Sequence, residues 1–140
     1  MPREASRAGW TYNTLSVNVP VASGTDAQEW VTDLTPGYQF EVVSAFFVVQ
    51  VAATGAGATR LFRVLKGTET VAASKTILLA DATPIGTVIT LTPSTTRTDR
   101  QYGDADTLSV DSPAADSVSF TAGTFQAFIV IRSRPQQLTT

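Results

Sequence analysis

The stretch YQFEVVSAFFVVQV, residues 38–51, decides the fold of this chain. Aromatic and β-branched side chains recur along it at alternate positions, which predicts a long β-strand. Its second half is apolar at every position from Ala45 to Val49, whereas a strand in a two-layer sandwich is expected to keep one polar face. We therefore expect Phe47, Val49 and Val51 to be covered by something besides the core. An arm of the same chain and a neighbouring subunit both remain open as that cover.

Shorter segments on both sides of this stretch carry strand patterns. Residues 15–19 alternate Leu and Val with Ser and Asn and stop at Pro20. Further strand candidates span residues 29–34, 60–66, 71–79, 86–91, 108–110 and 124–131. The sequence GAGA at residues 55–58 predicts a hairpin between the long strand and residues 60–66. The polar residues 92–103 predict a surface loop.

This strand count predicts an all-β fold. About seven or eight strands, with turn signals roughly every 8–12 residues, are typical of an antiparallel β-sandwich, here jelly-roll-like. The length of 140 residues and a hydrophobic content of 43% fit one domain with one core. We expect an extended N-terminal arm over residues 1–14, the sandwich over residues 15–131 and a C-terminal tail over residues 132–140. The order of the strands does not follow from the pattern.

The composition excludes most catalytic chemistry. The chain has no His and no Cys, which are the usual general bases, thiol nucleophiles and soft-metal ligands near neutral pH. An enzyme that uses only carboxylates, such as a glycosidase, is disfavoured because no paired Asp or Glu occupies an evident cleft-forming context. The sequence therefore predicts no enzyme, no cofactor and no metal.

Basic residues gather at the two ends of the chain. Arg3, Arg7, Arg132 and Arg134 lie there with Glu4 as the one acidic residue, while the body between them is acidic. These arginines are either solvated by chance or belong to arms that dock on an acidic neighbour, such as an adjacent copy. Four arginines are too few for nucleic acid, whose phosphates the body would repel. The N-terminal residues contain no apolar run, so neither a signal peptide nor a membrane partner is predicted.

Four aspartates close together in the sequence could form a Ca²⁺ site. Oxygen-rich loops can hold Ca²⁺, but the spacing of these residues fits no EF-hand loop, and Asp is common in turns because it bonds its own backbone. We favour the turn interpretation. The residues are Asp99, Asp104, Asp106 and Asp111.

Four aromatic residues could form a binding surface. Trp and Tyr could line a sugar-binding platform, or they could anchor a protein interface, where both are enriched. Two of the four lie near the expected N-terminal arm, which favours the interface. The residues are Trp10, Tyr12, Trp30 and Tyr38.

Residues 46–133 resemble a pattern found in small structural proteins of tailed bacteriophages. The run FFVVQVAATGAGATRLFRVLKGTETVAASKTILLADATPIGTVITLTP is followed by YGDADTLSVD and by the terminal TFQAFIVIRS. A Gly-Ala-rich hairpin, a KGT turn, a TPIGTVI strand, a GDADTLS turn and an aromatic-aliphatic closing strand occur in that order. This order is similar to that of capsid decoration, or cement, proteins. The resemblance implies a trimer with terminal arms that sits on the outer face of a capsid and braces neighbouring major capsid proteins.

The sequence thus predicts a non-enzymatic decoration protein on the outer capsid surface of a virion. It would be a homotrimer whose partner is the major capsid protein, and each copy would clamp adjacent subunits against the internal pressure of packaged DNA. The alternative is a carbohydrate-binding or host-attachment module of a phage fibre. The residues expected to bind the partner are Arg3, Arg7, Trp10, Tyr12, Phe47, Arg132 and Arg134.

Overall fold

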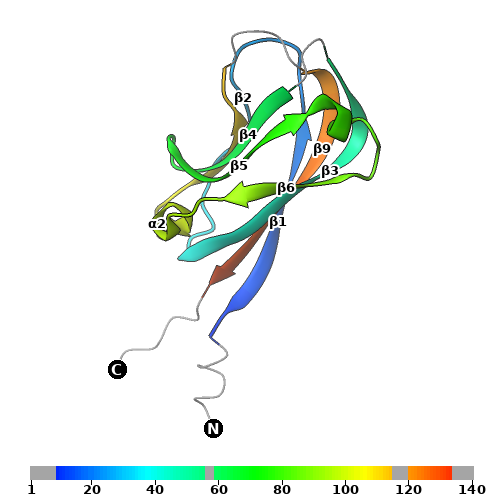
Figure 1. Ribbon diagram of the computed structural model, residues 1–140. Coiled ribbons are helices and arrows are strands. Elements are labelled where there is room, and N and C mark those ends of the chain that lie inside the picture. The colour runs from blue at the N-terminus through cyan, green and yellow to red at the C-terminus, as the bar shows by residue number, and fades with distance from the viewer. Residues whose placement is uncertain (1–8, 56–58, 115–119, 134–140) are drawn as a thin grey trace, which may run out of the picture.

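The computed structural model describes residues 9–55, 59–114 and 120–133. These residues form a continuous antiparallel sheet of nine strands that folds into two layers (Figure 1). The elements are β1 (Thr11–Pro20), β2 (Gln28–Leu34), β3 (Phe40–Gly55), β4 (Thr59–Lys66), β5 (Thr70–Leu78), the 3-10 helix η1 (Leu79–Ala82), β6 (Val88–Pro93), the helix α2 (Arg97–Arg100), β7 (Gln101–Tyr102), β8 (Leu108–Ser112) and β9 (Phe120–Ser133). The expected all-β antiparallel sandwich is confirmed.

The strand order is that of a jelly roll. The hydrogen-bonded path runs β1-β9-β3-β6-β5-β4-β8-β2, with β7 paired to β3. We call β1, β9, β3 and β6 the first layer and β2, β8, β4 and β5 the second layer; the pairing of β6 with β5 joins them. Without the two-residue β7, the chain order within the layers is 1-8-3-6 and 2-7-4-5, which is the interleaving of two Greek keys. At the ends of the path, the indole Nε1 of Trp30 on β2 donates to the carbonyl of Pro20 on β1 at 2.8 Å.

The predicted hairpin between β3 and β4 is wrong. β3 pairs with β9 along most of its length and with β6 at residues 45–48, and the strand order does not place β4 beside it. β4 instead lies in the second layer between β5 and β8. Residues 56–58 of the expected turn lie outside the described residues. Gly and Ala in a sequence indicate a change of chain direction, but they do not say which layer the next strand joins.

A cluster of aromatic rings holds the two layers together. Phe47 on β3 and Phe125 on β9 come from the first layer, and their ring centroids lie 5.3 and 5.6 Å from that of Phe62 on β4. All three side chains are fully buried. Trp30 on β2 stacks on Phe62 at 5.7 Å. Each such pair contributes about 0.5–1.5 kcal/mol beyond the burial of its area, so the rings fix how the layers face each other.

A register shift in β3 decides which of its side chains face the core. The shift lies between Val42 and Ser44, so Val42 and Ala45 are both fully buried although they are three residues apart. Phe47 and Val49 then point inward, and Phe46 points outward, where it stacks on Phe128 at 5.2 Å. The prediction of Phe47 as a partner contact is therefore wrong, because the second layer buries its ring completely. Of the three residues expected to need a separate cover, only Val51 is exposed.

Truncating the two neighbouring rings should separate their roles. Phe47→Ala should lower the free energy of unfolding by about 3–5 kcal/mol, because it leaves a cavity in the aromatic cluster. Phe46→Ala should cost about 1–2 kcal/mol, because its ring is only half-buried. Urea unfolding of both variants measures the difference. Equal losses would contradict the inward and outward assignment.

Candidate functional site

Four side chains form a row across four strands where β1 begins and β9 ends. In the register, Tyr12 on β1 lies opposite Arg132 on β9, and Arg132 lies opposite Glu41 on β3. Glu41 in turn lies opposite Gln101 on β7. Residues opposite each other in a ladder project from the same face of a sheet. The row therefore lies on the outer face of the first layer.

Glu41 lies at the centre of an arginine cluster, which we define as Arg97, Arg100 and Arg132. Its side chain is 4% exposed. Oε1 accepts from Arg97 Nη2 and from Arg132 Nη2, both at 3.2 Å, and Oε2 accepts from Arg100 Nη1 at 3.0 Å. Arg97 and Arg100 belong to α2, which lies next to the start of β3 (Figure 1). Three guanidinium groups thus surround one carboxylate, and the cluster keeps a surplus of positive charge.

The charges of this cluster are fixed by its own contacts. Burial by itself would raise the pKa of Glu41, but the hydrogen bonds and the positive charges of Arg97 and Arg132 outweigh it and lower that pKa. A hydrogen bond with the Tyr12 side chain, together with the contact to Glu41, raises the pKa of Arg132. The carboxylate is therefore ionised and the guanidinium is protonated at neutral pH.

A pocket of about 420 Å³ opens beside the cluster. Phe40 and Tyr102 form one wall as a stacked pair with ring centroids 4.5 Å apart. Tyr102 is held in place because its hydroxyl donates to the carbonyl of Leu65 at 2.9 Å. The Arg132 guanidinium lies 4.1 Å from the centroid of the Trp10 ring. Further lining comes from Tyr38, Gln39, Glu41, Gln101, Gly103 and Ser133. The pocket therefore combines aromatic walls with two charged side chains, those of Arg132 and Glu41.

Three of the residues predicted from sequence come together here. Trp10 and Arg132 line the pocket, and Tyr12 lies opposite Arg132 in the strand register. Residues 11–14, expected within the N-terminal arm, form the start of β1 and pair with β9. The predicted residues outside the described part of the chain are Arg3, Arg7 and Arg134.

The central residues of the site were not found from the sequence. Glu41 is the one charged residue in the stretch 38–51, and this isolated charge was a signal that a partner must exist. Arg97 and Arg100 lie in the segment 92–103, which was interpreted as a surface loop. That segment instead forms α2 and β7 and is tied to the sheet through Glu41.

The aspartates that could have suggested a Ca²⁺ loop have other contacts. Asp111 accepts two hydrogen bonds from Arg63, at 3.0 and 2.8 Å. Asp99 accepts from the Ser94 hydroxyl, and Asp106 accepts from the backbone N–H of Gly103. Within residues 9–55, 59–114 and 120–133, no group of three or more His, Cys, Asp or Glu side chains could hold a metal ion. In the same ranges, no helix is long and apolar enough to cross a membrane.

The Glu41 contacts should make stability depend on pH. A carboxylate whose pKa is lowered on folding adds stability above its unfolded pKa, about 4.5, and this contribution is lost as the pH falls through the folded value. Glu41→Gln should lower the free energy of unfolding at pH 7 by about 2 kcal/mol and weaken the loss of stability in acid. Urea unfolding at pH 7 and pH 4 measures both effects.

The matched control is Glu69→Gln, which removes one negative charge from an exposed position between β4 and β5. It should leave the stability at pH 7 within about 0.5 kcal/mol of the wild type. If Glu41→Gln behaved like this control, Glu41 would not hold the cluster.

Comparison with known proteins identifies a solved structure with a similar fold. No protein-family model matches the sequence, and no curated protein sequence matches it. A chain of the cyanophage Pam1 capsid asymmetric unit is similar in structure, with a TM-score of 0.55 and 13% identity, over 91% of this chain and 87% of that chain. A chain of the infectious bursal disease virus VP2 subviral particle matches with a TM-score of 0.39 and 10% identity, over 91% of this chain and 38% of that chain, which is too low to support an argument. The first match shows a shared fold.

Proposed function

We propose that this chain is a non-enzymatic structural protein of a phage capsid, and specifically a decoration protein on the outer surface of the shell. The observation that carries the proposal is the jelly-roll strand order together with the similar fold of a chain in the Pam1 capsid asymmetric unit. That likeness covers 91% of this chain and 87% of the other, so it extends well beyond one motif. The resemblance of residues 46–133 to decoration proteins points the same way.

The proposed mechanism is a clamp between neighbouring major capsid proteins. Such a protein binds only the assembled shell and therefore stabilises that state by mass action, and many copies on one lattice act together. The end of the molecule with the pocket and the arginine cluster is the proposed contact surface. It concentrates positive charge on a chain whose net charge is −2. Arg3, Arg7 and Arg134 would extend this surface as arms.

A homotrimer is part of the same proposal. The outer face of the first layer supports contact between copies, because Phe46 and Phe128 stack there and remain half-buried. Val48 lies next to this pair and opposite Val88, which is 59% exposed. Apolar side chains that gather on an outer face are typical of protein interfaces. Sedimentation equilibrium of the full chain gives the number of copies directly.

A carbohydrate-binding or host-attachment module is the second candidate. Tyr12 and Tyr38 are 56% and 39% exposed and could stack on sugars. However, Trp30 packs on Phe62 and donates to Pro20, so it does not join them. One face of the Trp10 ring lies against Arg132. The aromatic side chains thus do not form one open platform, which favours the capsid role.

Capsid binding tests the proposed function. Added to undecorated capsids, the protein should co-sediment with them and raise the temperature at which the packaged genome is released. The measurement is a dye-based assay of genome release, with and without saturating protein. Identical release temperatures at full occupancy would remove the stabilising role. Binding in a glycan screen without capsid binding would favour the host-attachment module.

Trp10 should be an anchor of the contact surface. Trp10→Ala should weaken capsid binding by about 2 kcal/mol or more, as the loss of an aromatic interface anchor does, while the thermal unfolding curve stays cooperative. Co-sedimentation at a series of protein concentrations measures the change. Leu78→Ala removes a half-exposed apolar side chain from β5, in the other layer, and serves as the control. Unchanged binding by Trp10→Ala would show that the shell is bound elsewhere.

A further inference from the structure

We propose that the pocket beside the arginine cluster binds a side-chain carboxylate on an acidic segment of the capsid protein. This inference rests on the proposed function, because it names the chemistry of the partner at the same contact surface. It concerns the pocket lined by Trp10, Tyr38, Glu41, Gln101, Tyr102 and Arg132.

The cluster contains more positive than negative charges. Arg97, Arg100 and Arg132 all bind the single carboxylate of Glu41, so the cluster can neutralise a further negative group. The Arg97 side chain is 56% exposed and reaches solvent. In an acidic chain with a pI of about 4.9, a surplus of guanidinium groups beside a pocket favours an anionic ligand.

The guanidinium groups of the cluster keep N–H donors that Glu41 does not use. A guanidinium group has five N–H donors, and Glu41 accepts two from Arg97 and one each from Arg100 and Arg132. The Nε of Arg132 is buried and has no hydrogen-bond partner. A buried donor on a charged group is costly to leave unpaired. A small adjustment of Arg132 toward an incoming carboxylate would pair it.

The geometry of the site favours a carboxylate over other anions. The guanidinium groups already bind the carboxylate of Glu41, so their forked geometry suits a second carboxylate. Tyr38, which lines the pocket and is 39% exposed, offers an aromatic surface for the methylene groups of a Glu side chain. Gln101 is exposed on β7 and can bond the backbone of an extended segment. The same face of Trp10 cannot hold both Arg132 and a sugar ring, which disfavours an acidic glycan.

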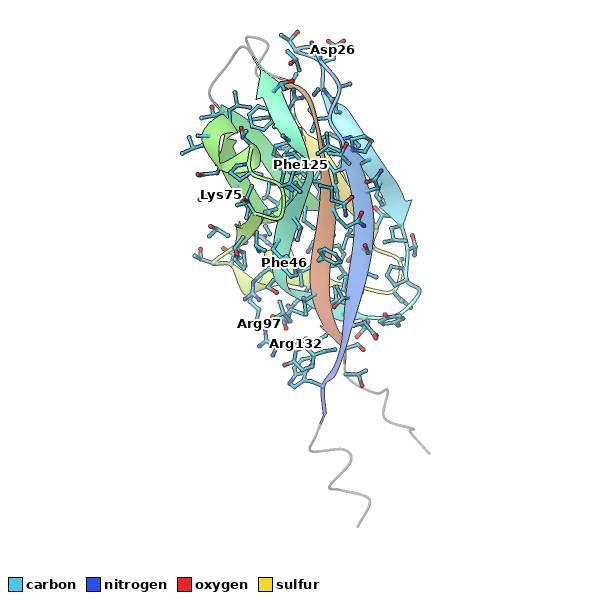
Figure 2. All side chains as sticks on the ribbon, turned by 90° about the vertical axis from the view of Figure 1, so that its right-hand side faces the viewer. Asp26, Phe46, Lys75, Arg97, Phe125 and Arg132 are labelled. Atoms are coloured by element: carbon cyan, nitrogen blue, oxygen red, sulfur yellow. The ribbon has the colours of Figure 1, made fainter. Side chains whose placement is uncertain are left out.

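The direct test is an NMR titration of the ¹⁵N-labelled full chain with hexaglutamate that carries an amidated C-terminus. We expect saturable shifts of the Trp10 indole N–H and of the Gln101 amide, and no shifts with amidated hexaglutamine. Arg97→Gln should weaken the binding about tenfold, which is the effect of losing one charge-assisted contact. Lys75→Gln is the matched control, because it removes an exposed positive charge from β5, and Figure 2 shows Lys75 well away from Arg97 and Arg132. The control should bind like the wild type.

Three outcomes of the titration would overturn the inference. An equal loss of binding in Arg97→Gln and Lys75→Gln would show diffuse charge attraction rather than a site. Tighter binding of inorganic phosphate or of a glucuronate oligosaccharide would assign the pocket to another class of anion. An absence of shifts at Trp10 and Gln101 would show that the acidic peptide does not enter the pocket.

Capsid co-sedimentation of the same proteins separates this inference from the proposed function. If the wild type does not bind capsids, the proposed function fails, and the titration still decides what the pocket binds. If the wild type and Arg97→Gln bind capsids equally well, the function stands and the inference is overturned. We expect Arg97→Gln to bind more weakly and the binding of the wild type to fall with increasing salt.

Discussion

The pairing of β3 with β9 is the constraint on which the rest of the structure depends. It runs from Glu41 opposite Arg132 to Gly55 opposite Phe120 and leaves one edge of each strand for β6 and β1. Its inward side chains, among them Phe47 and Phe125, meet the second layer through Phe62. Its outer face carries the stacked Phe46 and Phe128. One ladder therefore sets the layer order, the aromatic core and the position of the candidate site.

Glu41 holds three arginines in place at the end of this ladder. A helix as short as α2 has almost no stability of its own, since it forms too few hydrogen bonds to offset the cost of starting a helix. Arg97 and Arg100 attach it to the sheet through the Glu41 carboxylate, and Arg100 also donates to backbone carbonyls of Ser94 and Val42. Buried ion pairs add little net stability compared with apolar packing, but breaking one leaves an expensive charge. Glu41 therefore determines where the arginines lie more than it adds to the stability of the fold.

The strands could be predicted from the sequence because alternation and β-branched residues are local signals. The faces of β3 could not, since the register shift near Val43 moves the side chains that follow it, among them Phe46 and Phe47, to the other side of the sheet. This is why Phe47, rather than Phe46, was predicted as the outward ring. The strand order could not be predicted either, because it depends on pairings such as that of β1 with β9, which lie at opposite ends of the chain. The candidate site shows the same difference between local and long-range information. Trp10, Tyr12 and Arg132 could be predicted from residue type and position in the chain. The role of Glu41 could not, because it binds arginines 56, 59 and 91 residues away.

The proposed contact of this jelly roll with the outside of a phage shell lies at the end where β1 begins and β9 ends. A cryo-EM reconstruction of capsids saturated with the protein measures this most directly. We expect sandwich-shaped density on the outer surface, with α2 and the start of β1 against the major capsid protein. Density in which that end points into solvent while the loops at the far end of the sandwich contact the shell would contradict it.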